Sequence, residues 1–161
     1  MLNFNELYDL YANEVYKFAY WLSGDSFEAE DITSETFVRV WVRFSSIRTE
    51  TLKAYLFTIA RNIYLKKLRK QKKQVPLHEA FRDQIPEPEK LVDSRFELQR
   101  VRDALLNLSE LDRAAFILRV QHEMPYAEIS RVLGISLTAA RVKVHRVRKK
   151  LLAARTDQEV Y

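Results

Sequence analysis

Residues 125–150 read PYAEISRVLGISLTAARVKVHRVRKK, and this stretch decides the fold of the last part of the chain. Gly134, one of only two glycines in the protein, follows an apolar-periodic segment, where a helix commonly ends on a residue in the left-handed conformation. Ser136 then stands where an N-cap belongs, because its side chain can accept hydrogen bonds from the first free N–H groups of a helix. The stretch therefore predicts a helix, a glycine turn and a second helix.

The second of these helices combines an apolar stripe with a basic face. Four apolar residues recur at spacings of four, three and four, which places them on one buried side: Ala140, Val144, Val147 and Leu151. Six residues fall on the other side: Thr138, Arg141, Val142, His145, Arg146 and Lys149. No acidic residue occurs from Ile129 to Thr156. Such a helix-turn-helix suits reading of the DNA major groove. The alternative is an ordinary helical hairpin with a solvated basic face.

Composition favours an all-α protein. The 161 residues include two glycines and four prolines, which are too few turn residues for a many-stranded sheet. The absence of cysteine excludes disulfides and thiol catalysis and fits a reducing cytosol. The longest strongly apolar patch, Phe18 to Leu22, is too short to span a bilayer, and the first residues lack the pattern of a signal peptide. We therefore expect a cytoplasmic protein without membrane insertion.

Three of the four prolines mark a connector between two parts of the chain: Pro76, Pro86 and Pro88. The segment around them has poor helical periodicity, so we predict a linker over residues 74–93. It separates a domain at residues 1–73 from a domain at residues 94–161. The formal net charge is +5. The linker is acidic while both domains are basic, and basic domains suit a polyanion such as nucleic acid.

Helical periodicity predicts three helices in the first domain and four in the second. The first three span about residues 6–22, 25–43 and 51–72, and Asp25 with Glu28 resembles a capping box for the second. The expected buried face of the first helix carries Leu7, Leu10, Tyr11, Val15, Phe18 and Leu22. That of the second carries Ile32, Phe37, Val40 and Trp41, and that of the third carries Leu52, Tyr55, Leu56, Ile59 and Ile63. The second domain begins with helices over about 94–107 and 109–121, and the helix-turn-helix follows.

The third helix ends in a basic run. Seven basic residues and no acid lie between Arg61 and Lys73, and three aromatic residues stand upstream and within: Tyr55, Phe57 and Tyr64. Basic charge near aromatic rings suits backbone phosphates and unpaired bases. The alternative is that the rings belong to the core and the lysines form a solvated helix end.

Acidic residues gather in the first turns of the second helix: Glu28, Glu30, Asp31 and Glu35. They stabilise a helix N-terminus or dock onto a basic partner surface, and composition does not separate these two roles. The three histidines are scattered over different elements, and no metal-ligand, phosphate-loop or nucleophile motif occurs. We therefore expect no enzyme activity, no catalytic residue, no metal and no cofactor.

Four stretches in order along the chain resemble one family of proteins. They are EAEDITSETFVRVW at 28–41, AYLFTIARNIY at 54–64, LSELDRAAFILR at 108–119 and YAEISRVLGIS at 126–136. They are similar to regions 2 and 4 of extracytoplasmic-function (ECF, group 4) sigma factors, the small two-domain class of sigma-70 subunits of bacterial RNA polymerase. The resemblance extends over about residues 5–153. It implies two helical domains that recognise promoter DNA and bind the core polymerase.

The resemblance implies partners for each region. The second helix would dock on the clamp helices of the polymerase through Asp31, Ser34, Glu35 and Val38. A loop over residues 44–50 would capture an unpaired base of the −10 element, and the third helix would hold the melted strand. The residues implied in −10 binding are Phe44, Ser45, Ser46, Arg48, Arg61, Asn62, Lys66 and Lys67. The family usually has glutamine at the position of Ser34, so this chain departs from the pattern there.

For region 4 the resemblance implies reading of the −35 element by the six outward residues of the last helix and contact with the polymerase flap. The family usually has a small polar residue at the position of Val142, so the base preference is expected to differ. An anti-sigma factor covering both domains is a further partner that the resemblance implies.

Two other classes of function compete with a promoter-specificity subunit. A stand-alone helix-turn-helix regulator would bind specific DNA tightly without polymerase, although it leaves the first domain unexplained. An interaction module would use its basic faces on acidic protein, and a steep salt dependence of DNA affinity would argue against it.

Overall fold

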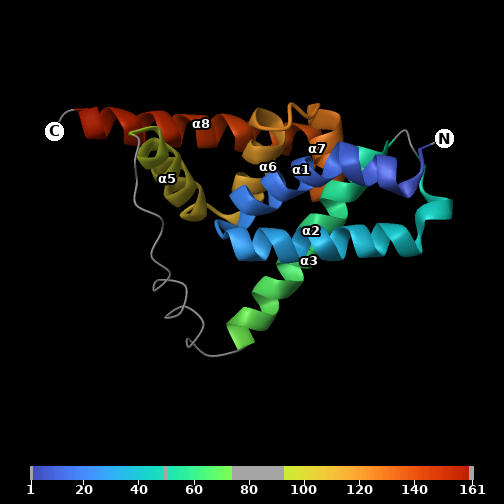
Figure 1. Ribbon diagram of the computed structural model, residues 1–161. Helices are drawn as coiled ribbons and strands as arrows, with labels where there is room; N and C mark the ends of the chain where they lie inside the picture. Colours follow the sequence, from blue (N-terminus) through green and yellow to red (C-terminus); the bar gives the residue numbers. More distant parts are fainter. Residues whose placement is uncertain (1, 49–50, 74–92, 160–161) are drawn as a thin grey trace.

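The computed structural model describes residues 2–48, 51–73 and 93–159 (Figure 1). Within these ranges the chain forms seven α-helices, one 3-10 turn and no strand. The elements are α1 (Phe4–Ser23), α2 (Ser26–Val42), η1 (Phe44–Ser46), α3 (Leu52–Lys73), α5 (Asp93–Leu106), α6 (Glu110–Val120), α7 (Tyr126–Leu133) and α8 (Leu137–Glu159). The all-α prediction is confirmed. The predicted linker lies outside the described residues except for its last residue, Asp93. None of the described helices has the length and apolar character that crossing a membrane requires.

Side-chain caps fix where the first two helices begin. At α1 the Asn3 Oδ1 accepts from the Glu6 N–H at 2.8 Å, and the Glu6 carboxylate accepts from the Asn3 N–H at 3.2 Å. This capping box was not predicted, because the helix was expected to begin only near residue 6. At α2 the predicted Asp25 cap is present, because its Oδ1 accepts from the Phe27 N–H at 2.8 Å. Gly24 ends α1 in the left-handed conformation with φ of 73°, which a side chain rarely adopts.

Helices α1, α2 and α3 pack on one another around large apolar side chains. Those with almost no exposed surface include Phe18, Leu22, Ile32, Val40, Leu56 and Ile63. The predicted faces are correct in outline but wrong at two positions, because Leu10 is 59% exposed and Trp41 62% exposed. At 100° per residue, each lies roughly 110° from the middle of the buried stripe of its helix. Trp41 instead packs edge-on against Phe4 at the surface, with ring centroids 4.8 Å apart.

Helices α6, α7 and α8 form the predicted helix-turn-helix with its supporting helix. Gly134 is left-handed with φ of 66°, and the Ser136 Oγ accepts from the Ala139 N–H at 3.0 Å. Ala140, Val144 and Val147 are fully buried, as their spacing predicts. The turn and the cap together fix the direction of α8, so that the face opposite its buried stripe points outward.

The two groups of helices share one continuous core. Helix α1 contacts α5 and α6, and α3 contacts α7. Figure 1 shows α6 and α7, in orange, lying along α1 and the start of α3. Contacts between the halves reach the end of α1, because a Cβ built on Gly24 would lie 2.6 Å from the Leu106 Cδ1 of α5. The free chain is therefore closed, with its N-terminal and C-terminal helices packed together.

Candidate nucleic-acid interface

The outward face of α8 carries the residues predicted to read DNA. All six of these side chains are exposed: Thr138, Arg141, Val142, His145, Arg146 and Lys149. The buried stripe on the other side of α8 fixes this orientation, since rotating the helix would expose apolar side chains. The helix therefore presents a continuous, largely basic surface to solvent.

A buried acid on α6 holds two cations of α8. The Asp112 side chain is 7% exposed, and its Oδ1 lies 3.2 Å from the Lys143 Nζ. Its Oδ2 lies 3.9 Å from the Arg146 Nη1. Asp112 falls near the start of the helix predicted over residues 109–121, and the sequence alone indicated no particular partner for it. The sequence held one signal of this contact. Residues 129–156 contain no acid, so any acidic partner for the inward-facing cations of α8 had to come from another element.

An aromatic ring at the start of α7 lies beside two arginines. The Arg119 guanidinium lies 4.3 Å from the centroid of the Tyr126 ring, and the Arg141 guanidinium lies 5.7 Å from it. Arg119 is itself anchored, because its Nη1 donates to the Met124 carbonyl at 3.1 Å. Cation–π attraction thus links α6, α7 and the outer face of α8.

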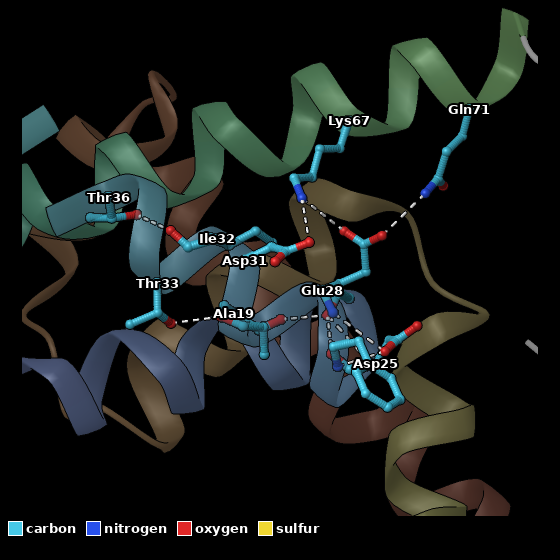
Figure 2. A network of polar contacts seen from close by, with 12 residues as sticks. Ala19, Asp25, Glu28, Asp31, Ile32, Thr33, Thr36, Lys67 and Gln71 are labelled. Carbon is cyan, nitrogen blue, oxygen red and sulfur yellow. Dashed lines mark hydrogen bonds and ion pairs between the residues drawn. The ribbon is translucent and has the colours of Figure 1, made fainter. Parts of the chain in front are cut away.

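The basic end of α3 is engaged with α2. The Lys67 Nζ lies 3.4 Å from the Glu28 carboxylate and 3.5 Å from the Asp31 carboxylate, as Figure 2 shows. Gln71 also donates to Glu28, at 3.5 Å. The resemblance assigned Lys67 to DNA and Asp31 to polymerase, and the structure brings these two side chains together. Asn62 and Lys66 are exposed on the same helix.

Arg61 lies between the two halves of the molecule. Its Nε and Nη2 donate to the two carboxylate oxygens of Glu110 at 2.7 and 2.8 Å, in a bidentate ion pair. The two side chains are only 11% and 15% exposed. Among the aromatic residues near this run, Phe57 and Tyr64 are buried, which supports their place in the core.

The loop after α2 projects polar side chains. Ser45, Ser46 and Arg48 are exposed, whereas Phe44 is half-buried and packs edge-on against Phe4 with ring centroids 6.2 Å apart. Residues 49–50 of this loop lie outside the described part of the chain.

The four residues assigned to polymerase share one outward side of α2. Asp31, Ser34 and Val38 are exposed, and Val38 retains 62% of its surface. Glu35 is half-exposed and pairs with Arg39 one turn later at 3.0 Å. Spacings of three and four residues place such side chains next to each other on a helix.

Arg113 joins the halves from inside the core. It is 5% exposed, and its guanidinium donates to the carbonyls of Leu22, Leu105 and Leu108 and to the Tyr64 hydroxyl. Leu22 and Tyr64 belong to the N-terminal helices. A buried guanidinium needs such partners, because burial of an unpaired charge is strongly unfavourable.

His122, in the turn between α6 and α7, lies against the N-terminal helices. Its Nδ1 is 2.8 Å from the Glu14 carboxylate, and its ring centroid is 4.7 Å from that of Phe57. Burial lowers the pKa of His122, although the Glu14 carboxylate acts in the opposite direction. Its Nε2 is buried without a hydrogen-bond partner among the described residues, which also disfavours protonation.

No three His, Asp or Glu side chains in the described ranges converge as metal ligands would. The chemistry that these surfaces support is electrostatic and hydrogen-bonded contact with a polyanion.

Two family models match the chain in order along its sequence. The model of sigma-70 region 2 matches residues 7–74, and the model of sigma-70 region 4 matches residues 98–151. The first match covers most of α1 with α2 and α3, and the second includes the whole helix-turn-helix. The chain belongs to the sigma-70 family. It is an RNA polymerase sigma factor, a protein that directs the polymerase to promoters.

The sigma factor is similar to curated relatives from two bacteria. It is 34% identical to the ECF sigma factor SigE of Mycolicibacterium smegmatis over 158 residues, which cover 94% of this chain but 61% of that protein. It is 29% identical to the ECF sigma factor SigM of Bacillus subtilis over 157 residues, which cover 94% of each. These relatives agree with the ECF class that the sequence resembles.

Solved structures share its arrangement of helices. The sigma factor RpoE of Bartonella quintana, solved in complex with the anti-sigma factor NepR, matches with a TM-score of 0.76 and 27% identity over 92% of this chain and 93% of that one. CnrH, solved in complex with the cytosolic domain of CnrY, shares the fold with a TM-score of 0.70 and 23% identity over 96% of this chain and 88% of that one.

Proposed function

We propose that this sigma factor reads the −35 element with the outward face of α8 and the −10 element with α3 and the loop after α2. The observation that carries the proposal is the exposure of all six α8 residues assigned to DNA. A side chain that reads base edges must reach the major groove without disturbing the core. The outward side chains of α8 meet that condition, because the core contacts of this helix are made by the stripe on its opposite side.

Promoter binding in this proposal requires the two halves to separate. Arg61, one of the residues assigned to the −10 strand, is paired with Glu110 of the C-terminal half in the closed chain. The bidentate pair neutralises this guanidinium and the side chain is only 11% exposed, so the pair must open before phosphate can take the place of Glu110. The outward side of α2 stays exposed in the closed form, so polymerase can bind there first. Binding of both promoter elements by one open chain then raises the effective concentration of each region.

The proposal includes an anti-sigma factor. RpoE, which shares this arrangement of helices, was solved with such a partner bound. An inhibitor that binds both halves would stabilise the closed form and keep Arg61 paired. The protein would act in the cytoplasm, where polymerase and chromosome meet, and it would act by binding without a covalent step of its own.

Run-off transcription with purified core polymerase on a promoter library tests the proposal. The sigma factor should produce discrete start sites that share −35 and −10 motifs. Arg141→Ala should weaken use of those promoters by about 1–3 kcal/mol if this arginine makes a bidentate contact with guanine. Arg131→Ala, which removes one exposed cation from α7, is the matched control and should change much less. Tight specific binding by the free protein, with no stimulation of transcription, would instead support a stand-alone regulator.

A further inference from the structure

The contact between α6 and α8 at Asp112 reaches a residue assigned to DNA reading. Asp112 lies in the first turn of α6, where its backbone N–H donates to the Ser109 Oγ at 3.2 Å. Its carboxylate is directed at α8 and is 7% exposed, while its partner Arg146 remains 51% exposed. The Arg146 Nη1 lies 3.9 Å from the buried carboxylate, an ion-pair distance longer than a hydrogen bond, and much of the arginine surface faces solvent.

A buried carboxylate strongly favours cationic partners within reach. Both partners that surround Asp112 come from α8: Lys143, which is 20% exposed, and Arg146. A guanidinium has five N–H donors in a planar fork, so contact through one Nη leaves other donors for a second acceptor. Asp112 can therefore restrict the rotamers of Arg146 without occupying its outer edge.

We propose that Asp112 is a positioning residue for base reading, which acts by holding Arg146 in the orientation that meets DNA. The inference rests on the proposed role of α8 at the −35 element. An arginine that is already ordered loses less conformational freedom on binding than a freely rotating one. Asp112 thus increases discrimination between bases although its own charge repels phosphate.

The two effects of Asp112 on DNA binding have opposite signs. Loss of its charge should strengthen binding to any DNA sequence, because non-specific affinity follows the net positive charge of the surface. Loss of its hold on Arg146 should reduce preference for the correct base pair. Unfolding of the helix-turn-helix would weaken both kinds of binding, so a merely structural role predicts a different result.

The test measures fluorescence anisotropy of the full-length sigma factor on labelled duplexes. One duplex carries the −35 motif found by run-off transcription, a second is scrambled, and single-base variants locate the base pair whose preference Arg146→Ala abolishes. Asp112→Asn should lower discrimination at that base pair by roughly threefold to tenfold. It should also bind the scrambled duplex more tightly than wild type does.

Asp103→Asn is the matched control, because Asp103 carries the same charge on α5 with a 64% exposed side chain that pairs with neighbouring Arg102. It should leave discrimination unchanged. Asp112→Glu keeps the charge but moves the carboxylate by one methylene, so it should retain wild-type affinity for the scrambled duplex and lose part of the discrimination. This second variant gives a result even if Asp112→Asn does not fold.

Full discrimination in a folded Asp112 variant would overturn the positioning role while leaving −35 reading by α8 intact. Absence of any preference for the −35 duplex in wild type, alone and with core polymerase, would overturn both.

Discussion

The basic end of α3 and the basic face of α8 differ in how their cations are engaged. On α3, Arg61 pairs with Glu110 from the other half of the molecule, and Lys67 pairs with Glu28 and Asp31. On α8, the residues assigned to DNA are all exposed, although Arg146 also pairs with Asp112 at 3.9 Å. Two basic runs that look alike in the sequence therefore form different surfaces. The surface of α3 is partly occupied by acidic side chains, and the surface of α8 is open to solvent. If α8 reads the −35 element and α3 the −10 element, as proposed, the closed chain exposes the first surface and withholds part of the second.

Arg113→Ala should have the largest effect. It removes the guanidinium that links the two halves and so destabilises the closed form, in which the surfaces of α3 and α8 differ. Four acceptors lose a donor, and although the Leu105 carbonyl still accepts from the Leu108 N–H, each buried acceptor left without a partner costs about 1–3 kcal/mol. We expect the free energy of unfolding in urea to fall by roughly 3 kcal/mol or more. Arg131→Ala, at an exposed site, is the control and should change it by less than about 0.5 kcal/mol. Equal stability of the two variants would show that Arg113 does not hold the halves together.

Glu110→Gln should make the surface of α3 resemble that of α8. The substitution leaves Arg61 without its carboxylate partner, so the guanidinium becomes available to phosphate. Affinity for single-stranded DNA should rise, and the slope of log affinity against log salt should steepen by about 0.7, the value for one added phosphate contact. Glu97→Gln, which makes the same change at an exposed position of α5, should raise affinity without steepening the slope as much. Identical slopes for the two variants would contradict the inferred masking of Arg61.

Acidification should weaken the closed form through His122. Its pKa is lowered in the folded state by burial, so the stability that it contributes is present above its unfolded pKa near 6.5 and is lost as pH falls through the folded value. The pKa of Glu14 is lowered too: burial raises it, but the hydrogen bond from His122 and nearby cations outweigh burial. That contribution disappears only below about pH 4.5.

Urea unfolding between about pH 7.5 and 5.5 therefore reports mainly on the histidine. The wild type should lose stability over this range, and His122→Phe, which keeps a ring beside Phe57, should lose less. Parallel pH profiles for the two proteins would exclude this role of His122.

Asp31→Asn should have the smallest effect on stability. The Asp31 side chain is 74% exposed, and exposed ion pairs contribute about 0–1 kcal/mol. We expect the free energy of unfolding to change by less than about 0.5 kcal/mol while the affinity for core polymerase falls. Asp9→Asn, at an exposed site on α1, is the control for the loss of charge. Unchanged polymerase affinity would remove Asp31 from the docking surface.

Local signals account for what the sequence could predict. Gly134 and Ser136 determine a turn and a cap within three residues of each other, and Ala140, Val144 and Val147 determine a face by spacing alone. The same reasoning wrongly predicted that Leu10 and Trp41 are buried. A spacing of three or four residues also includes side chains at the edge of the buried stripe, and these two lie there.

The contacts between the halves have no local signal. Arg113 meets the Leu22 carbonyl across 91 residues of sequence, and His122 meets Glu14 across 108. Periodicity reports which side of a helix is buried but carries no information about which distant element covers it. The sequence therefore predicted the buried face of α8, and that of α2 except at Trp41, whereas the pairing of Arg61 and of Asp112 required the structure.

The packing of His122 against Phe57 also makes the closed form sensitive to temperature. Separation of the halves brings buried aromatic and aliphatic surface into water, and hydration of such surface raises the heat capacity. The free energy that holds the halves together then follows a curve with a maximum and falls on both sides of it. A sigma factor closed in this way becomes easier to open as the cell warms beyond that maximum, with no ligand bound and no charge changed.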